Sequence, residues 1–328
     1  MNNITYSFEN LYKIFMDELL QQKFSKSPKE LYEPIIYTIN QSGKRLRPIF
    51  TLMSCNLFCD DINKAMPQAL AVELLHNFTL IHDDIMDDAP LRHGQKTVHT
   101  KWNKNLAILA GDTMYALAYR FAMQCELKKL PIILKTFNDT ALEACEGQQM
   151  DINFENKSLV DKTDYMLMIK YKTAVLFGAS MRIGAILGDA NEKDIDLLTG
   201  FGDNIGMAFQ LKDDLLDVYG EQQKFGKQTG LDILESKKTF LYISALERAD
   251  KTTKEKLMFV YRKNNPNPEE KVKETKAIFD SLDIESYTEQ IISDYVNKSL
   301  QKLDLVNVNK ERKAGLEDLA NRLIYRSK

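Results

Sequence analysis

Four aspartates within six positions, placed in an otherwise apolar segment with helical spacing, constrain this chain more than any other feature. Residues 74–94 read LLHNFTLIHDDIMDDAPLRHG. On a helix, Asp83 and Asp87 are one turn apart, so their carboxylates project from one face and repel each other. Carboxylate oxygens are ligands that Mg²⁺ uses together with substrate phosphates. The stretch therefore predicts a helix that carries a cation-binding cluster.

A second acidic cluster has the same spacing. Residues 209–217 read FQLKDDLLD, again inside an apolar, helical pattern. A charged, solvated helix face would explain one such cluster on its own. Two clusters in one chain favour two helices that face each other across a shared metal and diphosphate site.

The motifs HDDIMDDAPLRHG and GMAFQLKDDLLDVYG resemble the first and second aspartate-rich motifs of the trans-prenyltransferases, the isoprenyl (polyprenyl) diphosphate synthases. The chain is most similar to the geranylgeranyl diphosphate synthases of that family. Further motifs follow the family's order: GKRLRP at 43–48, GQQMD at 147–151, YKTA at 171–174 and FGKQTGLDILESKKT at 225–239. The resemblance covers nearly the whole chain.

The resemblance implies an all-α fold, a single large helical bundle of the isoprenoid synthase type with a central active-site cavity. One prenyltransferase domain would cover residues 1–328. The implied reaction is the Mg²⁺-dependent head-to-tail condensation of isopentenyl diphosphate with allylic diphosphates, which gives an all-trans prenyl diphosphate. The implied assembly is a homodimer.

The resemblance also assigns roles to individual residues. The metal ligands would be the carboxylates of Asp83, Asp84, Asp87, Asp213, Asp214 and Asp217. The diphosphates would be bound by Gly43, Lys44, Arg47, His76, Arg92, His93 and Lys237. The catalytic wall of the allylic site would consist of Lys172, Thr173, Gln210 and Lys227, with Gln148 and Asp151 in support.

One position departs from the family pattern. The residue after Arg92 is usually a second arginine that binds isopentenyl diphosphate, and here it is His93. A histidine is shorter than an arginine and only partly charged near neutral pH. We therefore expect weaker binding of isopentenyl diphosphate than is usual in the family.

Product length is expected to depend on the helix that carries Asp83. Phe78 lies about 7–8 Å further along such a helix, because each residue adds about 1.5 Å. Leu75 and Val72 continue the same stripe, so these three side chains could form a floor under the growing product. Within the family, one aromatic at this position resembles enzymes that stop near geranylgeranyl length. Alternatively, Phe78 is ordinary core, and the product is of farnesyl length or longer.

Composition excludes several other classes of protein. The formal net charge is −3, so the chain lacks the basic character of a nucleic-acid-binding domain. No apolar run is long enough to span a bilayer, and the N-terminus does not resemble a secretory signal. We expect a cytoplasmic protein. The four cysteines and four histidines lack metal-site spacing, so reduced, buried thiols are expected and zinc is not.

Two other functions fit the same fold less well. A terpene cyclase would not need the second diphosphate pocket that GKRLRP indicates. A non-catalytic regulatory subunit could lose its aspartates without penalty, whereas both clusters are complete here.

Helical periodicity is predicted almost throughout, with no convincing strand alternation. The expected helices cover residues 4–23, 30–41, a third opened by GKRLRP at 43–48 and running to about 59, then 63–88, 103–124, 131–153, 162–188, 192–219, 238–249, 252–263, 268–280, 285–303 and 309–325. Residues 220–236 are expected to form a polar loop. The segment 103–124 is apolar on most sides, which makes it the candidate dimer contact.

Overall fold

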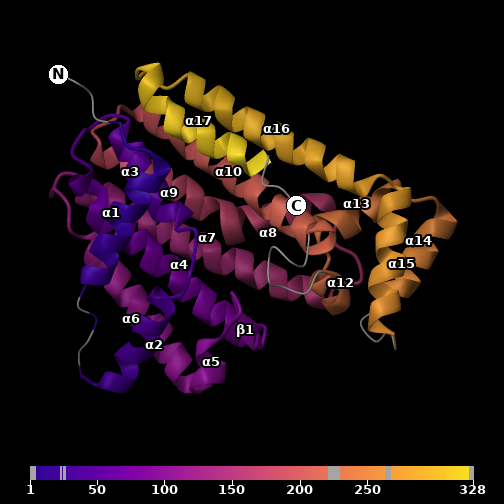
Figure 1. The fold of residues 1–328 in the computed structure, drawn as a ribbon. Coiled ribbons are helices and arrows are strands. Elements are labelled where there is room, and N and C mark those ends of the chain that lie inside the picture. The colour runs from indigo at the N-terminus through magenta and orange to yellow at the C-terminus, as the bar shows by residue number, and fades with distance from the viewer. Residues whose placement is uncertain (1–4, 23, 25–26, 221–229, 263–266, 325–328) are drawn as a thin grey trace. The chain divides into compact units, whose positions relative to one another are not determined.

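The computed structural model describes residues 5–22, 24, 27–220, 230–262 and 267–324, and these residues are almost entirely helical (Figure 1). The longer helices before residue 190 are α1 (Phe8–Gln21), α2 (Lys29–Ile39), α3 (Leu46–Asn56), α4 (Met66–Met86), α6 (Lys104–Ala122), α7 (Leu130–Asn156), α8 (Lys162–Ile169) and α9 (Val175–Leu187). They are followed by α10 (Glu192–Tyr219), α13 (Phe240–Arg248), α14 (Lys251–Val260), α15 (Pro268–Ser281), α16 (Ile284–Asp304) and α17 (Lys310–Ile324). The predicted all-α fold is confirmed.

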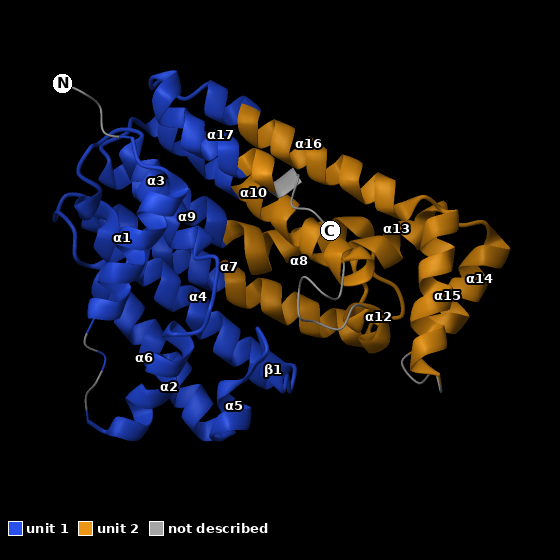
Figure 2. Cartoon of the chain, viewed as in Figure 1, with its two compact units in different colours: residues 1–142, 176–202, 301–319 blue, residues 143–175, 203–300, 320–328 orange. Residues whose placement is uncertain are grey.

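The chain divides into two compact units (Figure 2). Unit 1 comprises residues 1–142, 176–202 and 301–319, and unit 2 comprises residues 143–175, 203–300 and 320–328. Helices α7, α10 and α16 each have residues in both units. The first aspartate cluster belongs to unit 1 and the second to unit 2. That one domain covers the chain stays a prediction.

Small residues allow close helix packing in unit 1. A Cβ on Gly184 of α9 would lie 2.1 Å from the backbone oxygen of Thr51 on α3, so only glycine fits there. Beside this contact, the Ser54 hydroxyl donates a hydrogen bond to the Met181 carbonyl over 2.6 Å. These contacts hold α9 against α3.

A buried ion pair fixes the start of α3. Arg45 has a left-handed backbone (φ 48°) and precedes the helix. Its guanidinium pairs with the carboxylate of Glu73, which is 2% exposed. The same guanidinium donates to the carbonyls of Ile39 and Gln41, each over 2.7 Å. Arg45 therefore holds the GKRLRP segment to α4 and to the end of α2.

The structure corrects several local expectations. The expected helix over 162–188 is interrupted by a π-helical turn, η2 (Lys170–Ala174). The expected loop over 220–236 contains a short helix, α12 (Leu231–Glu235), within the described residues 230–236. After Pro90 the chain forms a two-stranded antiparallel hairpin of β1 (Leu91–Arg92) and β2 (Gln95–Lys96), with Gly94 in its turn at φ +75°. The cysteines are reduced as expected, but only Cys55 is buried: Cys59 and Cys125 are partly exposed and Cys145 is exposed.

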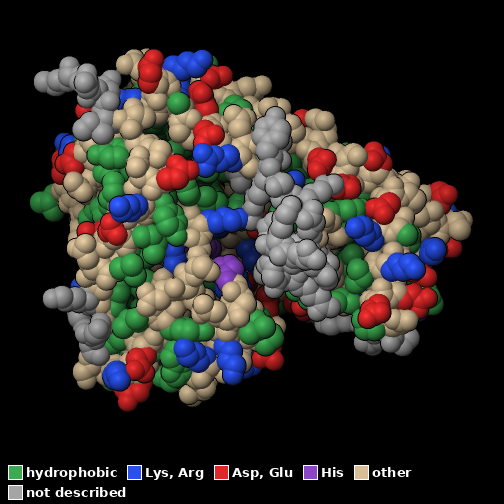
Figure 3. Space-filling model, in the orientation of Figure 1, with side chains coloured by type: hydrophobic (Ala, Val, Ile, Leu, Met, Phe, Trp, Pro, Cys, Tyr) green, Lys and Arg blue, Asp and Glu red, His purple; other side chains and the backbone are tan. Residues whose placement is uncertain are grey.

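Acidic and basic side chains alternate over the visible surface rather than forming one patch of a single sign (Figure 3). In the part of the chain that the structure describes, no helix has the length and apolar character needed to cross a membrane.

We predict that Arg45→Met lowers the free energy of unfolding by about 3–5 kcal/mol, because it leaves the Glu73 carboxylate buried without its counter-ion. Urea denaturation followed by circular dichroism measures the change. Lys29→Met is the matched control, because Lys29 pairs with Glu33 on an exposed helix face and should contribute almost nothing. Equal stability of the Arg45 variant and the control would contradict the structural role of the pair.

Candidate active site

The first aspartate cluster occupies the carboxyl end of α4. Asp83 lies in the last turn of the helix, and the Asp87 amide donates to the Asp83 carbonyl over 2.9 Å, so the two residues are one turn apart as predicted. The carboxyl end of a helix carries partial negative charge, which disfavours anions and favours cations. Asp88 leaves the helix at φ 49° and pairs with Lys104 over 3.0 Å. The cluster that remains is therefore Asp83, Asp84 and Asp87.

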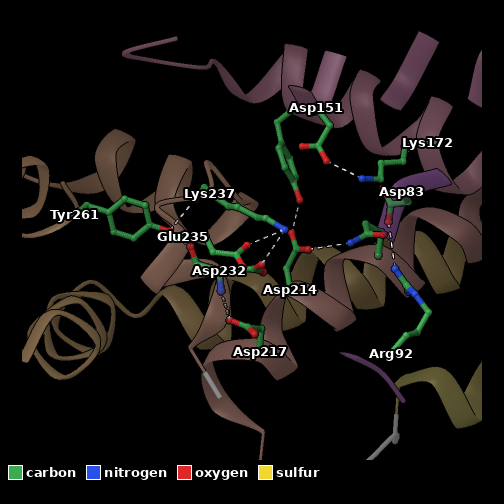
Figure 4. A network of polar contacts seen from close by, with 12 residues as sticks. Asp83, Arg92, Asp151, Lys172, Asp214, Asp217, Asp232, Glu235, Lys237 and Tyr261 are labelled. Atoms are coloured by element: carbon green, nitrogen blue, oxygen red, sulfur yellow. Dashed lines mark hydrogen bonds and ion pairs between the residues drawn. The ribbon is translucent and has the colours of Figure 1, made fainter. Parts of the chain in front are cut away.

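Arg92 compensates part of this negative charge. It lies on β1, where the hairpin brings its guanidinium back to the helix end (Figure 4). Its Nε donates to Asp84 Oδ1 over 2.8 Å, and its Nη2 donates to Asp83 Oδ2 over 3.3 Å. Asp84 is 4% exposed, and burial raises the pKa of its carboxyl despite Arg92. Asp83 is partly exposed and Asp87 is exposed.

Arg47 and His76 form a cationic site in the same unit. Arg47 lies in the first turn of α3, stacks over the Phe177 ring at 4.4 Å, and lies 3.0 Å from His76 Nε2 through its Nη1. Arginine can only donate, so His76 Nε2 is the acceptor. Burial lowers the pKa of His76 well below its ordinary value, and the nearby charges of Arg47, Arg92, Arg45 and His93 lower it further. A neutral imidazole among these cations forms a site that favours an anion.

Three further residues predicted to bind diphosphate lie close to Arg47 or Arg92 in the sequence. The Gly43 carbonyl accepts a hydrogen bond from the Tyr12 hydroxyl over 3.3 Å. Lys44 is exposed. His93 occupies the hairpin turn at φ 51°.

Phe78 is part of a row of aromatic rings between α4 and α6. Its ring centroid lies 5.0 Å from that of Tyr115, and Tyr115 lies 5.1 Å from Tyr119. Tyr119 continues the row to Phe137 at 5.0 Å, and its hydroxyl donates to Asn138 over 2.9 Å. Leu75 and Val72, the other expected floor residues, are fully buried. The sequence did not indicate the tyrosines of α6, because they lie in a different helix.

The second aspartate cluster also lies at the carboxyl end of its helix, α10. Asp214 is 5% exposed and accepts hydrogen bonds from the Tyr165 hydroxyl and, over 3.0 Å, from Gln210 Nε2. Burial raises the pKa of Asp214 to about 7, and these hydrogen bonds only partly oppose it. Asp213 and Asp217 are partly exposed. In both clusters the second aspartate is buried and held, while its neighbours remain accessible.

A further carboxylate that the sequence did not indicate joins this cluster. The backbone amide of Asp232 on α12 donates to Asp217 Oδ2 over 3.0 Å, and the Gly230 amide donates to the Asp217 carbonyl over 2.6 Å (Figure 4). Burial raises the pKa of Asp232 well above its ordinary value, as do the charges of Asp217 and Asp214. The Lys237 ammonium lies 3.9 Å from Asp232 and 3.1 Å from Glu235.

The π-helical turn η2 explains the GQQMD motif. A Cβ on Gly147 would lie 2.2 Å from the Lys172 amide nitrogen, so glycine lets α7 approach this turn. One turn further on, Asp151 accepts a hydrogen bond from the Lys172 ammonium over 2.7 Å. Asp151 thus orients a predicted catalytic lysine. π-Helical turns occur frequently at functional sites.

Thr173 and Gln210 are brought together as the predicted wall requires. The Thr173 hydroxyl donates to Gln210 Oε1 over 2.9 Å, while Gln210 Nε2 donates to Asp214. The Asp214 carboxylate fixes which end of the amide points toward Thr173. Lys227, the fourth predicted residue of this wall, lies outside the described residues.

The donor set fits a divalent metal bound together with a phosphate ligand. Among the described residues, no three His, Cys, Asp or Glu side chains converge as a ready-made metal site. Mg²⁺ usually takes one or two carboxylates and completes its shell with water and substrate phosphates. Asp83, Asp87, Asp213 and Asp217 are accessible oxygen donors at negative helix ends, which is what such a metal requires.

Comparison with known proteins gives a consistent result. A model of the polyprenyl synthetase family matches residues 28–279. The chain is 38% identical to a short chain isoprenyl diphosphate synthase from Methanocaldococcus jannaschii, over 95% of this chain and 93% of that protein. It is 35% identical to a geranylgeranyl diphosphate synthase from Methanosarcina mazei, over 89% of this chain and 87% of that protein.

Solved structures agree with the sequence comparison. A crystal structure of a geranylgeranyl pyrophosphate synthase superposes with a TM-score of 0.93 at 40% identity, covering 99% of this chain and 100% of that chain. A geranylgeranyl pyrophosphate synthetase from Pyrococcus horikoshii gives a TM-score of 0.90 at 34% identity, covering 98% and 99%. Fold, motifs and relatives agree, and the chain belongs to the polyprenyl synthetase family.

Proposed function

We propose that this chain is a trans-prenyltransferase that condenses isopentenyl diphosphate head-to-tail with allylic diphosphates to give geranylgeranyl diphosphate, in a Mg²⁺-dependent reaction. The observation that carries the proposal is the cationic site of Arg47 and His76, in the same unit as the first aspartate cluster. One unit thus offers candidate ligands for a metal-bound phosphate and a second anion site. A terpene cyclase would need only the former.

The reaction needs no covalent bond between the substrates and a side chain of the protein. Cleavage of the allylic carbon–oxygen bond releases diphosphate and leaves a carbocation. The electron pair of the isopentenyl double bond forms the new carbon–carbon bond, and loss of a proton restores a double bond. When bound, Mg²⁺ offsets the negative charge of the departing diphosphate. The side chains bind, orient and exclude water.

We assign the accessible aspartates Asp83, Asp87, Asp213 and Asp217 to the metals and the buried Asp84 and Asp214 to holding the helix ends. Arg92 and Lys172 would bind the allylic diphosphate, as would Lys237 and Lys227. The Thr173 hydroxyl oxygen and the Gln210 carbonyl would direct negative dipoles toward the carbocation.

Labelled isopentenyl diphosphate tests the proposal when it is supplied with ten-, fifteen- or twenty-carbon allylic primers and Mg²⁺. The expected result is a ladder that ends at geranylgeranyl length and disappears when the metal is chelated. Asp83→Asn should reduce kcat by about 10²-fold or more, since it removes an electrostatic contribution to the transition state. Asp88→Asn is the matched control, because Asp88 pairs with Lys104. Formation of a cyclic hydrocarbon, or no product at all, would refute the proposal.

We predict that Phe78→Ala lengthens the product. The substitution removes the ring that contacts Tyr115 and opens space along the row toward Tyr119. Chromatography of the dephosphorylated products measures the chain length. Phe50→Leu, which changes an aromatic in the separate contact with Phe177, is the control and should leave the product length unchanged. An unaltered ladder from the Phe78 variant would place the floor elsewhere.

We predict that His93→Arg binds isopentenyl diphosphate several-fold more tightly at pH 8. In the parent chain, binding should tighten as the pH falls toward 6, because protonation of His93 adds a positive charge. His76 should not contribute to this trend, since its pKa lies well below the ordinary value. The KM for isopentenyl diphosphate between pH 6 and pH 8 measures both effects. Equal or tighter binding by the parent chain at pH 8 would contradict the prediction.

We further propose a homodimer formed through α6 and α7, as the apolar segment 103–124 predicts. Large apolar side chains of unit 1 are exposed on these two helices and on the segment between them: Ile108, Leu109, Met123, Leu127, Ile132 and Leu142. Exposed apolar surface of this extent marks an interaction site.

Light scattering after size exclusion should therefore give the mass of two chains. The double substitution Ile108→Glu and Leu109→Glu should give one chain, because it places charges in the apolar contact. Leu20→Glu, at an equally exposed leucine of α1, is the control and should remain dimeric. A parent chain that elutes as a monomer at micromolar concentration would exclude this interface.

A further inference from the structure

The turn that carries Asp232 and Lys237 is held by a buried lysine of α15. Lys271 is 2% exposed, and its ammonium donates to the Leu234 carbonyl over 3.0 Å and to the Ser236 hydroxyl over 2.6 Å. Within the described residues, no carboxylate forms an ion pair with Lys271. A buried charge without a counter-ion is costly. Here the buried ammonium is stabilised by hydrogen bonds to one main-chain carbonyl and one hydroxyl at the end of α12.

A buried tyrosine holds the same turn from a second side. The Tyr261 hydroxyl donates to the Lys237 carbonyl over 2.7 Å and lies 3.5 Å from the Asp232 carbonyl (Figure 4). Its ring stacks on Tyr242 at a centroid distance of 4.0 Å. The Lys237 amide in turn donates to the Asp232 carbonyl over 2.9 Å. A backbone hydrogen bond therefore joins Asp232 and Lys237 across the turn, and Tyr261 holds both residues in place.

Helix α15 also contacts the segments on either side of this turn. The Val272 side chain covers Gly230, where a Cβ would lie only 2.9 Å away. Asp280, at the other end of α15, accepts a hydrogen bond from the Tyr219 hydroxyl over 2.9 Å. Tyr219 ends α10, two residues after Asp217. One helix thus contacts both the end of α10 and the turn that α10 meets through Asp217.

We propose that Lys271 and Tyr261 are positioning residues that hold the 230–237 turn, and so place Asp232 and Lys237 for the allylic diphosphate. The inference deepens the proposed function and rests on it for the identity of the ligand. Neither residue touches the substrate. Tyr261 acts through main-chain carbonyls of the turn, and Lys271 acts through the Leu234 carbonyl and the Ser236 hydroxyl.

Hydrogen–deuterium exchange of the full chain without ligand tests the clamp directly. Lys271→Met keeps the apolar stem and removes the donors, and Tyr261→Phe removes only the hydroxyl. Each should accelerate exchange of residues 231–237 about tenfold, because local opening becomes easier. Exchange in α4, which belongs to unit 1, should not change. Lys273→Met is the matched control, because Lys273 is exposed on the same helix.

Steady-state kinetics then separates positioning from a general loss of structure. Both variants should raise the KM for the allylic diphosphate about fivefold, through misplacement of the turn. The KM for isopentenyl diphosphate, assigned to Arg47 and His76 in unit 1, should stay within about twofold. Loss of folded protein would instead lower kcat and leave both KM values unchanged.

Unchanged exchange of residues 231–237 in both variants would overturn the clamp. Faster exchange with an unchanged allylic KM would overturn its link to the substrate. If the parent chain fails to transfer prenyl groups at all, the proposed function fails, while the exchange experiment still decides whether Lys271 and Tyr261 hold the turn.

Discussion

Repulsion between carboxylates at negative helix ends is the constraint on which the rest of this structure depends. Asp83 and Asp87 lie where α4 ends, and Asp213 and Asp217 lie where α10 ends. Both the helix dipole and the neighbouring charges disfavour these positions for anions. Burial is the main cause of the raised pKa values of Asp84, Asp214 and Asp232, and neighbouring carboxylates raise them further. A divalent cation would offset that repulsion.

Neighbouring side chains offset part of this carboxylate repulsion, and a bound cation would offset the rest. Arg92 donates hydrogen bonds to Asp84 and Asp83. Tyr165 and Gln210 donate hydrogen bonds to Asp214. The buried member of each cluster thus accepts hydrogen bonds from neighbouring side chains, while the other members are more exposed. On this division rests our proposal that the second aspartate of each pair supports the site.

Local patterns predicted the helices and both clusters, because helical periodicity and one-turn spacing are properties of contiguous residues. Contacts between distant segments could not be read in this way. Asp232 joins Asp217 through a backbone amide fifteen positions away, and the π-helical turn at Lys172 depends on its approach to Gly147. Likewise, Arg45 looks like a basic binding residue within GKRLRP, but its guanidinium forms an ion pair with Glu73.

Product length illustrates the same limit at the level of function. A single aromatic at Phe78 is visible in the sequence, but its ring is one member of a row that α6 completes with Tyr115 and Tyr119. The Tyr119 hydroxyl donates a hydrogen bond to Asn138, which fixes this ring in the row. A shortened side chain at position 78 would therefore open space along the row toward Tyr119, and we expect the product to lengthen into that space. We expect the whole row to limit how far the product can grow, and contacts between helices distant in sequence bring this row together.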